Sequence, residues 1–170
     1  MVVLGLDVST NTIGYAFIED KKILDMGFID ISKEKTIKDK AYRVLEVLDE
    51  NLHIDETKKI IVEDSLSGFA SGFTRMQTII KLAKINSVIC FLMEWKYEIE
   101  VELVNPNSAR KRVFGKARVK GIKAKDYVKE QVEKRFDVEQ FIKMNKRGKP
   151  DKKNIDAYDA LVCAMYESKI

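Results

Sequence analysis

The stretch that decides the fold is residues 4–16, LGLDVSTNTIGYA. It belongs to an apolar, β-branched run over residues 2–8, which is typical of a buried strand, and a second apolar run follows over residues 13–18 after a polar turn. Asp20-Lys21-Lys22 predicts another tight turn before a third strand over residues 23–31. Three strands joined by two tight turns predict an antiparallel meander.

Beyond the meander, segments of helical and of strand-like pattern alternate. Residues 38–52 repeat apolar positions at helical spacing, and residues 59–62 form a short apolar run that ends at Glu63. We therefore expect a single α/β domain over residues 1–170, in which a five-stranded mixed sheet has helices on both faces. The other predicted elements are a Gly/Ser-rich loop at 65–71, helices at 74–96, 124–136 and 154–168, a strand at 100–104, a short helix capped by Ser108, and basic loops at 114–123 and 143–153.

The composition is that of a globular intracellular protein. Hydrophobic residues make up 45% of the 170 residues, which is enough for a packed core and too many for a disordered chain. Cys90 and Cys163 lie far apart in apolar runs, so we expect buried free thiols in a reducing compartment. No secretory signal is visible and no run approaches the roughly 20 apolar residues of a membrane span. These features predict a soluble, cytoplasmic protein with no membrane partner.

Charge is distributed unevenly along the chain. Residues 110–153 hold 17 Lys and Arg against 6 Asp and Glu, a net +11, whereas the rest holds 14 against 21, a net −7. Such a basic region indicates a polyanion partner such as nucleic acid. The alternative is a solvated lysine-rich surface with no binding role.

Four acids stand out by position. Asp7 and Glu63 each come at the end of an apolar strand, where a carboxylate is costly to bury without a partner or a metal ion. Asp156 and Asp159 are three residues apart in NIDAYDAL, which places both on one helix face. Taken singly, each has a simpler explanation as a turn former or a helix cap, so the prediction of a metal site depends on their combination.

Ligands that are all oxygen select hard cations, so we expect Mg²⁺, with Mn²⁺ as a substitute. Two such cations about 3.5–4 Å apart activate water and stabilise the leaving oxygen of a phosphodiester. The sole histidine, His53, falls near the end of a predicted surface helix, which argues against a site that depends on histidine.

Several of these motifs together resemble the RuvC-type Holliday junction resolvases, particularly small phage-like members. LGLDVSTNTIGYA resembles the first strand-turn-strand of the family, IIVEDS its second acidic motif, and NIDAYDALVCA its final helix. The resemblance covers nearly the whole chain and implies a ribonuclease H-like fold. It also implies that Asp7, Glu63, Asp156 and Asp159 are the metal ligands and that Lys125, which aligns with a functional lysine of the family, assists catalysis.

The resemblance implies a homodimer that nicks two strands of a four-way DNA junction during recombination or repair. A helix over residues 74–96 with apolar residues on more than one face suits a dimer interface, or else a core helix covered by the basic region. Phe69 and Phe73 are the candidates for an aromatic wedge at the junction, and Arg110 stands where the family has lysine. The residues expected to contact backbone phosphates are Arg110, Lys111, Arg112, Lys116, Arg118, Lys120, Lys123 and Lys125.

Other functions remain open at this point. A ribonuclease H that cuts RNA–DNA hybrids has a similar order of acids. A non-catalytic nucleic-acid-binding module of the same fold is a second alternative, although all four acids are present. An actin-like sugar kinase or ATPase also has an Asp-x-Ser/Thr-Thr motif after a strand, as in Asp7–Thr10, but needs roughly twice this length.

Overall fold

The centre of the molecule is a five-stranded sheet, as expected from the sequence. The computed structural model describes residues 1–64 and 73–167. The strand order is β3-β2-β1-β4-β5; β2 runs antiparallel to both β1 and β3, whereas β4 runs parallel to both β1 and β5. The strands are β1 (Val2–Val8), β2 (Thr12–Glu19), β3 (Lys22–Asp30), β4 (Thr57–Glu63) and β5 (Val101–Val104).

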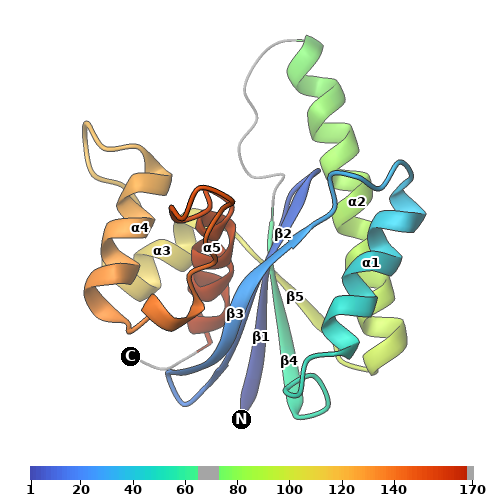
Figure 1. The fold of residues 1–170 in the computed structure, drawn as a ribbon, viewed down its shortest axis with the longest axis horizontal. Coiled ribbons are helices and arrows are strands. Elements are labelled where there is room, and N and C mark those ends of the chain that lie inside the picture. The colour runs from blue at the N-terminus through green and yellow to red at the C-terminus, as the bar shows by residue number, and fades with distance from the viewer. Residues whose placement is uncertain (65–72, 168–170) are drawn as a thin grey trace.

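Helices cover both faces of this sheet (Figure 1). Alternate residues of β1 separate the two cores: Leu4 and Leu6 pack towards α1 and α2, whereas Val3 packs towards the C-terminal helices. Asp7 lies four residues after Val3 on the same strand, and side chains an even number of residues apart share a face, so Asp7 also faces the C-terminal helices. The helices are α1 (Ile37–Asp49) and α2 (Phe73–Tyr97) on one face, and α3 (Pro106–Phe114), α4 (Ala124–Arg135) and α5 (Asn154–Met165) on the other.

Two glycines allow α5 to lie directly on the sheet. A Cβ added at Gly5 of β1 would lie 2.1 Å from the Ala160 carbonyl oxygen, and one added at Gly14 of β2 would lie 1.9 Å from the Asp156 carbonyl oxygen. Only residues without a side chain leave room for this backbone-to-backbone approach. The small Ala164 completes the contact on the helix side. The position of α5, and of the acids it carries, is thus set by glycines in the strands.

Helix α2 keeps an apolar outer face. Ile85, Ile89 and Met93 are buried against the sheet, whereas Phe91 and Trp95 are 64% and 70% exposed. The basic-region helices α3 and α4 lie on the opposite face of the sheet, so they do not cover α2 as the alternative interpretation expected (Figure 1). Residues Met76–Tyr97 are also long and apolar enough to cross a membrane by length and composition, contrary to our expectation that no segment would be. A helix that packs one side in the core and shows an apolar other side meets the same criterion.

A few local predictions were wrong. The cap of α3 is Asn105, not Ser108: the Asn105 side chain accepts hydrogen bonds from the backbone N–H groups of Asn107 and Ser108, and Pro106 occupies the first helical position, which needs no donor. Helix α5 ends at Met165, three residues before the predicted end. The 3₁₀ turn η1 (Glu139–Phe141) had no signal in the sequence. Both cysteines are free as predicted, but Cys90 is only half-buried.

Candidate active site

Asp7 and Glu63 are brought together by the pairing of β1 with β4. Leu6 is the parallel partner of Val62, so the two acids follow one residue later on adjacent strands. Both belong to the set of alternate residues that faces α5. Their position is the carboxyl end of the two strands, at the upper end of the sheet in Figure 1. This edge is where α/β sheets place ligand sites.

The other two acids come from the start of α5. Asp156 lies in its first turn and Asp159 one turn later, and both are buried, Asp159 with only 4% of its surface exposed. Gly14 of β2 lets the Asp156 backbone lie directly on that strand. Gly14 is also the β-ladder partner of Asp7 on β1, so this end of α5 lies close to Asp7. The structure therefore places all four acids at one end of the sheet.

The acids perturb one another, as a shared site requires. Burial raises the pKa of Asp7 well above its usual range, and the nearby charges of Glu63, Asp159 and Asp156 raise it further. Burial and the charge of Asp159 raise the pKa of Glu63 to about 7, and burial also raises the pKa of Asp159. Accumulated negative charge in a buried site is the situation that a bound cation relieves.

Two basic side chains partly neutralise the acids. Arg110 of α3 donates through Nη2 to Oδ1 of Asp159 at 3.0 Å, and both side chains are buried. Lys125 of α4 donates through Nζ to Oδ1 of Asp156 at 2.8 Å, although the lysine side chain is 58% exposed. Burial lowers the pKa of Lys125, but its hydrogen bond to Asp156 and the surrounding acids outweigh this and raise it overall.

The donor set suits a hard divalent cation. It consists of carboxylate oxygens alone, and the other titratable side chains in reach do not compete. Cys163 is buried beside the acids and its pKa is raised well above the usual range, which keeps it a neutral thiol. His53 contacts the Phe17 ring in the core on the α1–α2 side of the sheet, away from the acids.

Within the described part of the chain, no three His, Cys, Asp or Glu side chains already form a set of metal ligands. Arg110 and Lys125 each hold one α5 carboxylate in an ion pair. The described residues thus hold the four acids at one end of the sheet, with the two acids of α5 paired to basic side chains.

The other predicted DNA-contacting residues have varied positions. Arg110 is buried in the site rather than on the surface. Arg112 lies over the Tyr166 ring, with its guanidinium 4.9 Å from the ring centre, at the far end of α5 from Asp156. Phe69 lies outside the described residues, and the side chain of Phe73 is not among those described. The exposed residues are Lys111, Arg112, Lys116, Arg118, Lys120, Lys123 and Lys125, all but the first two on or beside the loop between α3 and α4.

Sequence reasoning missed the residues that position the site. Gly5 and Gly14 carry a readable signal, since a glycine inside a strand indicates close approach of another backbone. The burial of Arg110 carries no such signal, because it sits among lysines and arginines that are exposed.

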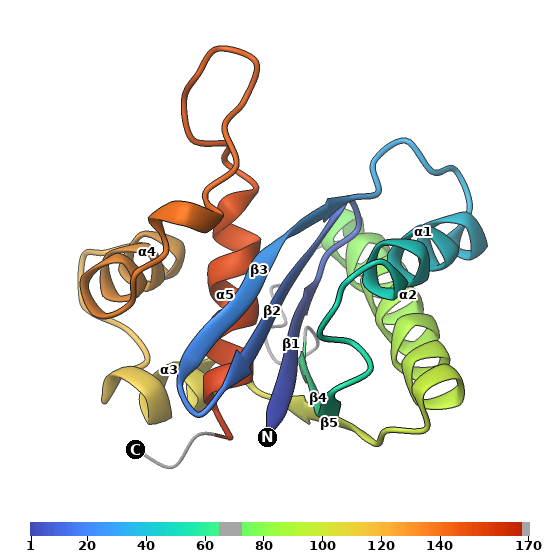
Figure 2. The ribbon, with the colours of Figure 1, turned by 60° about the horizontal axis from the view of Figure 1, so that its bottom comes forward.

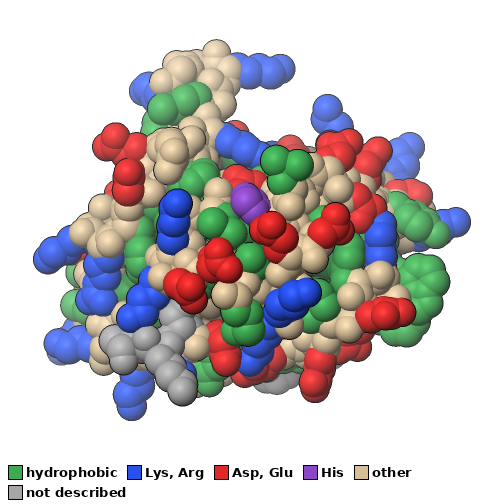
Figure 3. Space-filling view, turned by 90° about the horizontal axis from the view of Figure 1, so that it is seen from below, with side chains coloured by type: hydrophobic (Ala, Val, Ile, Leu, Met, Phe, Trp, Pro, Cys, Tyr) green, Lys and Arg blue, Asp and Glu red, His purple; other side chains and the backbone are tan. Residues whose placement is uncertain are grey.

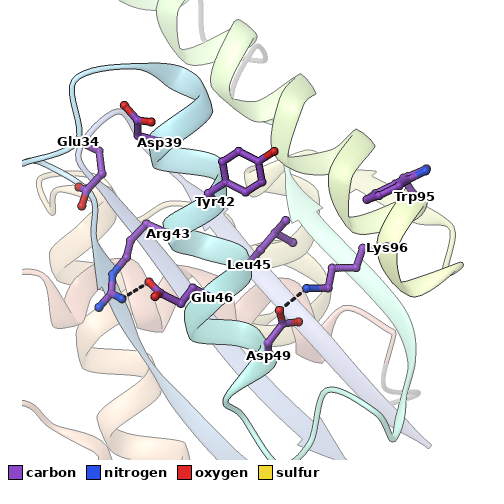
Figure 4. Close-up of a pocket in the computed structure, with 9 residues that line it drawn as sticks. All are labelled: Glu34, Asp39, Tyr42, Arg43, Leu45, Glu46, Asp49, Trp95 and Lys96. Atoms are coloured by element: carbon purple, nitrogen blue, oxygen red, sulfur yellow. Dashed lines mark hydrogen bonds and ion pairs between the residues drawn. The ribbon is translucent and has the colours of Figure 1, made fainter.

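A groove lies elsewhere, between α1 and α2, and has a volume of about 980 Å³. Figure 4 shows Tyr42 and Leu45 of α1 and Trp95 of α2 along it, with ion pairs Arg43–Glu46 and Lys96–Asp49 at its rim. Both helices cover the face of the sheet opposite α5. The groove is therefore separate from the acids and is not the active site.

Comparisons with known proteins agree with this geometry. The family model described as "Crossover junction endodeoxyribonuclease RuvC" matches residues 3–166. A RuvC from Prochlorococcus marinus (strain MIT 9312) is 28% identical over 169 residues, which are 97% of this chain and 94% of that protein.

Solved structures show the same fold at lower identity. Thermus thermophilus RuvC in complex with a Holliday junction substrate has a TM-score of 0.63 and 14% identity, over 99% of this chain and 92% of that one. The yeast mitochondrial Holliday junction resolvase Ydc2 has a TM-score of 0.56 and 17% identity, over 96% of this chain and 76% of that one. The predicted ribonuclease H-like fold is confirmed. Because the family model spans nearly the whole sequence, this chain belongs to the RuvC family of crossover junction endodeoxyribonucleases, which are structure-specific DNA endonucleases.

Proposed function

We propose that this chain cuts four-way junctions and other branched DNA by metal-dependent hydrolysis, with Asp7, Glu63, Asp156 and Asp159 holding the cations. The observation that carries this proposal is the gathering of four acids from β1, β4 and α5 at one end of the sheet, where burial first, and then the neighbouring acids, raise the pKa values of Asp7, Glu63 and Asp159. We infer Mg²⁺ as the natural cation, with Mn²⁺ as a substitute and two ions per site, because the donors are carboxylates. Family membership argues against the kinase, ribonuclease H and non-catalytic alternatives.

Bound cations would supply Lewis-acid stabilisation of charge on phosphate oxygens and a source of hydroxide near neutral pH. The four acids of the chain would hold and orient them. Asp7 and Glu63 belong to strands inside the sheet, and Asp159 is fixed by Arg110, so three of the four ligands have little freedom to move. A site held by rigid elements needs little rearrangement during the reaction.

We assign different roles to the two basic residues. Both partners of the Arg110–Asp159 ion pair are buried, so Arg110 stays in place and keeps the Asp159 carboxylate oriented. Lys125 reaches Asp156 from an exposed position, so it is free to exchange this carboxylate for a phosphate oxygen of the DNA. Lys125→Gln should therefore lower the cutting rate by about 100-fold or more with little loss of stability.

Exposed basic residues near the site support binding of the DNA backbone. The loop between α3 and α4 lies at the same end of the molecule as the acids (Figure 1). It carries Lys116, Arg118, Lys120 and Lys123, all exposed. Contacts to phosphates contain little sequence information, so we expect the protein to select its substrate by shape.

We also propose that the protein acts as a homodimer through the outer face of α2. Met76, Ile80, Phe91 and Trp95 are exposed there and fall at spacings of a helix face. A patch of this kind on a soluble DNA enzyme marks a protein interface. The groove beside Trp95 extends the same surface towards α1 (Figure 4). Two subunits provide the two active sites that paired cuts across a junction require.

The test is nicking of a labelled four-way junction, compared with a linear duplex and an RNA–DNA hybrid of the same sequences. We expect cuts in the junction that require Mg²⁺ or Mn²⁺ and disappear with Asp7→Asn. A matched control is Asp137→Asn, an exposed acid after α4, which should cut normally. Absence of nicks with every divalent cation, or full activity of Asp7→Asn, would contradict the proposal.

A further inference from the structure

Residues 143–153, KMNKRGKPDKK, form a basic hairpin between η1 and α5. Six of them are Lys or Arg and only Asp151 is acidic, a net charge of +5. Met144 and Pro150 make an antiparallel bridge across it. Figure 2 shows this segment projecting beyond the beginning of α5, and in Figure 3 the projecting lobe at the upper left carries Lys and Arg side chains.

The turn of the hairpin is ordered by its own hydrogen bonds. The Asn145 backbone N–H donates to the Lys149 carbonyl at 2.7 Å, and the Asn145 side-chain oxygen accepts from the N–H groups of Arg147 at 2.8 Å and Lys149 at 3.3 Å. Gly148 adopts φ +69°, the left-handed conformation that glycine tolerates best. The basic side chains therefore project from a hydrogen-bonded turn with a defined backbone conformation.

The base of the hairpin is anchored to the rest of the fold. The buried Asn154 accepts from the Lys143 N–H at 3.1 Å and donates to the carbonyl oxygens of Lys143 and Asp151, both at 2.9 Å. Lys153 forms an ion pair with Asp30 of β3. Two basic residues at the base thus have structural partners.

The basic residues at the tip of the hairpin have no ion-pair partner among the described residues. Lys146, Arg147 and Lys149 are exposed, and within residues 1–64 and 73–167 they make no ion pair. A role in solubility would not require the hydrogen-bonded turn that holds these three charges together. Their fixed arrangement lowers the entropy cost of binding several phosphates at once.

The hairpin also continues directly into the active site. The Asp156 N–H donates to the Lys153 carbonyl at 3.1 Å, so the base of the hairpin belongs to the turn that carries a predicted metal ligand. About three to four extended residues separate base and tip, a distance of about 10–13 Å. This distance corresponds to about three to four phosphates along one DNA strand.

We propose that the 143–153 hairpin is a second DNA-binding element, in which Lys146, Arg147 and Lys149 bind backbone phosphates of the duplex arm next to the strand that is cut. The inference rests on the proposed endonuclease function and adds a contact separate from the α3–α4 loop. The partner is a nucleic acid backbone because the tip offers three exposed cations, and because the hairpin adjoins the acids proposed to act on a phosphodiester.

The experiment compares two triple variants in an Asp7→Asn background, which should bind junctions without cutting them. One is Lys146→Gln/Arg147→Gln/Lys149→Gln. The other is Lys21→Gln/Lys22→Gln/Lys58→Gln, which removes the same charge from exposed residues at the opposite end of the sheet. Affinity for a labelled four-way junction is measured over a series of salt concentrations, and protected phosphates are located by hydroxyl-radical footprinting.

We expect the hairpin variant to bind about 10- to 100-fold more weakly at 0.15 M salt, and the slope of log K against log salt to become less steep by about 2 to 3. It should also lose protection of a few phosphates on one arm. The control should change affinity less than about threefold, and Lys146→Arg/Arg147→Lys/Lys149→Arg should bind normally because the charges remain.

The outcomes separate the two proposals. If the native protein cuts junctions but the hairpin variant matches the far-end control in affinity, slope and footprint, the hairpin is not a DNA contact and the proposed function stands. If the native protein neither cuts nor binds a junction, the proposed function fails and this inference falls with it.

Discussion

Arg110 and Asp159 form an ion pair of 3.0 Å inside the protein, between the middle of α3 and the second turn of α5. The Nε atom of the same guanidinium is buried without a hydrogen-bond partner among the described residues. The arginine therefore does not complete all its own hydrogen bonds, and its position serves the carboxylate. A charge fixed in this way holds Asp159, a proposed metal ligand, in place before any cation or DNA arrives.

Removing this arginine should destabilise the protein. In Arg110→Ala the buried carboxylate of Asp159 loses its partner, and breaking one side of a buried ion pair costs about 3–5 kcal/mol. The free energy of unfolding in urea, measured with EDTA present, should fall by that amount, and Mg²⁺ should restore part of it. The control is Arg112→Ala, which removes only a contact with the Tyr166 ring and should cost about 1 kcal/mol or less. Equal losses of unfolding free energy in the two variants would show that the Arg110–Asp159 ion pair contributes no more to stability than the Arg112–Tyr166 contact.

The metal-free protein should lose stability as pH rises through neutrality. Asp7, Glu63 and Asp159 have pKa values raised in the folded state, Glu63 to about 7, so the protonated folded form is favoured at low pH. A group with a raised folded pKa contributes stability below its unfolded value and loses it as pH passes the folded value. Between pH 6 and 8 we expect a loss of about 1–3 kcal/mol in EDTA. Mg²⁺ should reduce this loss, because cations favour the ionised acids.

The substitution Asp7→Asn isolates this effect. It removes one of the repelling charges, so in EDTA at pH 8 it should raise the free energy of unfolding by about 1–2 kcal/mol while abolishing the cutting activity. Glu130→Gln, an exposed acid on α4, should change neither. A metal-free protein whose stability is flat from pH 6 to 8, and unchanged by Asp7→Asn, would mean that the four acids do not share a site.

The outer face of α2 predicts the oligomeric state. Phe91→Glu/Trp95→Glu places two charges on the apolar face, so we expect monomers by sedimentation or light scattering at concentrations where the native protein is a dimer. Paired cuts across a junction should become single nicks, because each subunit keeps its own acids. The control is Leu52→Glu, an equally apolar residue that is 88% exposed on the connection between α1 and β4. A native protein that sediments as a monomer would refute the dimer.

Much of the fold could be predicted from the sequence because the deciding signals are local. Apolar runs separated by turns indicate the β1–β3 meander, and acids that end such runs, such as Asp7 and Glu63, are brought to one edge by any parallel pairing. The burial of Arg110 could not be predicted in this way, since it depends on how α3 packs against α5. The Asn105 cap was missed because Ser108 is also a good capping residue, and only the Pro106 between them favours the earlier start.

Gly14 gives the sharpest test of how the fold builds the site. A Cβ there would lie 1.9 Å from the Asp156 carbonyl oxygen, which is fixed backbone, so Gly14→Ala must push the start of α5 away from the sheet. At Gly27 the three atoms nearest to a Cβ belong to side chains, namely Oη and Cζ of Tyr15 at 2.9 and 3.1 Å and Nζ of Lys143 at 3.2 Å, and none is backbone. We expect Gly14→Ala to cost about 3 kcal/mol of stability and Gly27→Ala about 1 kcal/mol or less.

The same pair of variants separates stability from metal binding. At a temperature where both are folded, calorimetric titration with Mn²⁺ should show binding at least tenfold weaker for Gly14→Ala than for Gly27→Ala, because the displaced helix carries Asp156 and Asp159 away from Asp7. If folded Gly14→Ala binds Mn²⁺ as tightly as Gly27→Ala, the two acids of α5 do not need their close approach to the strands, and the cations are held by other residues.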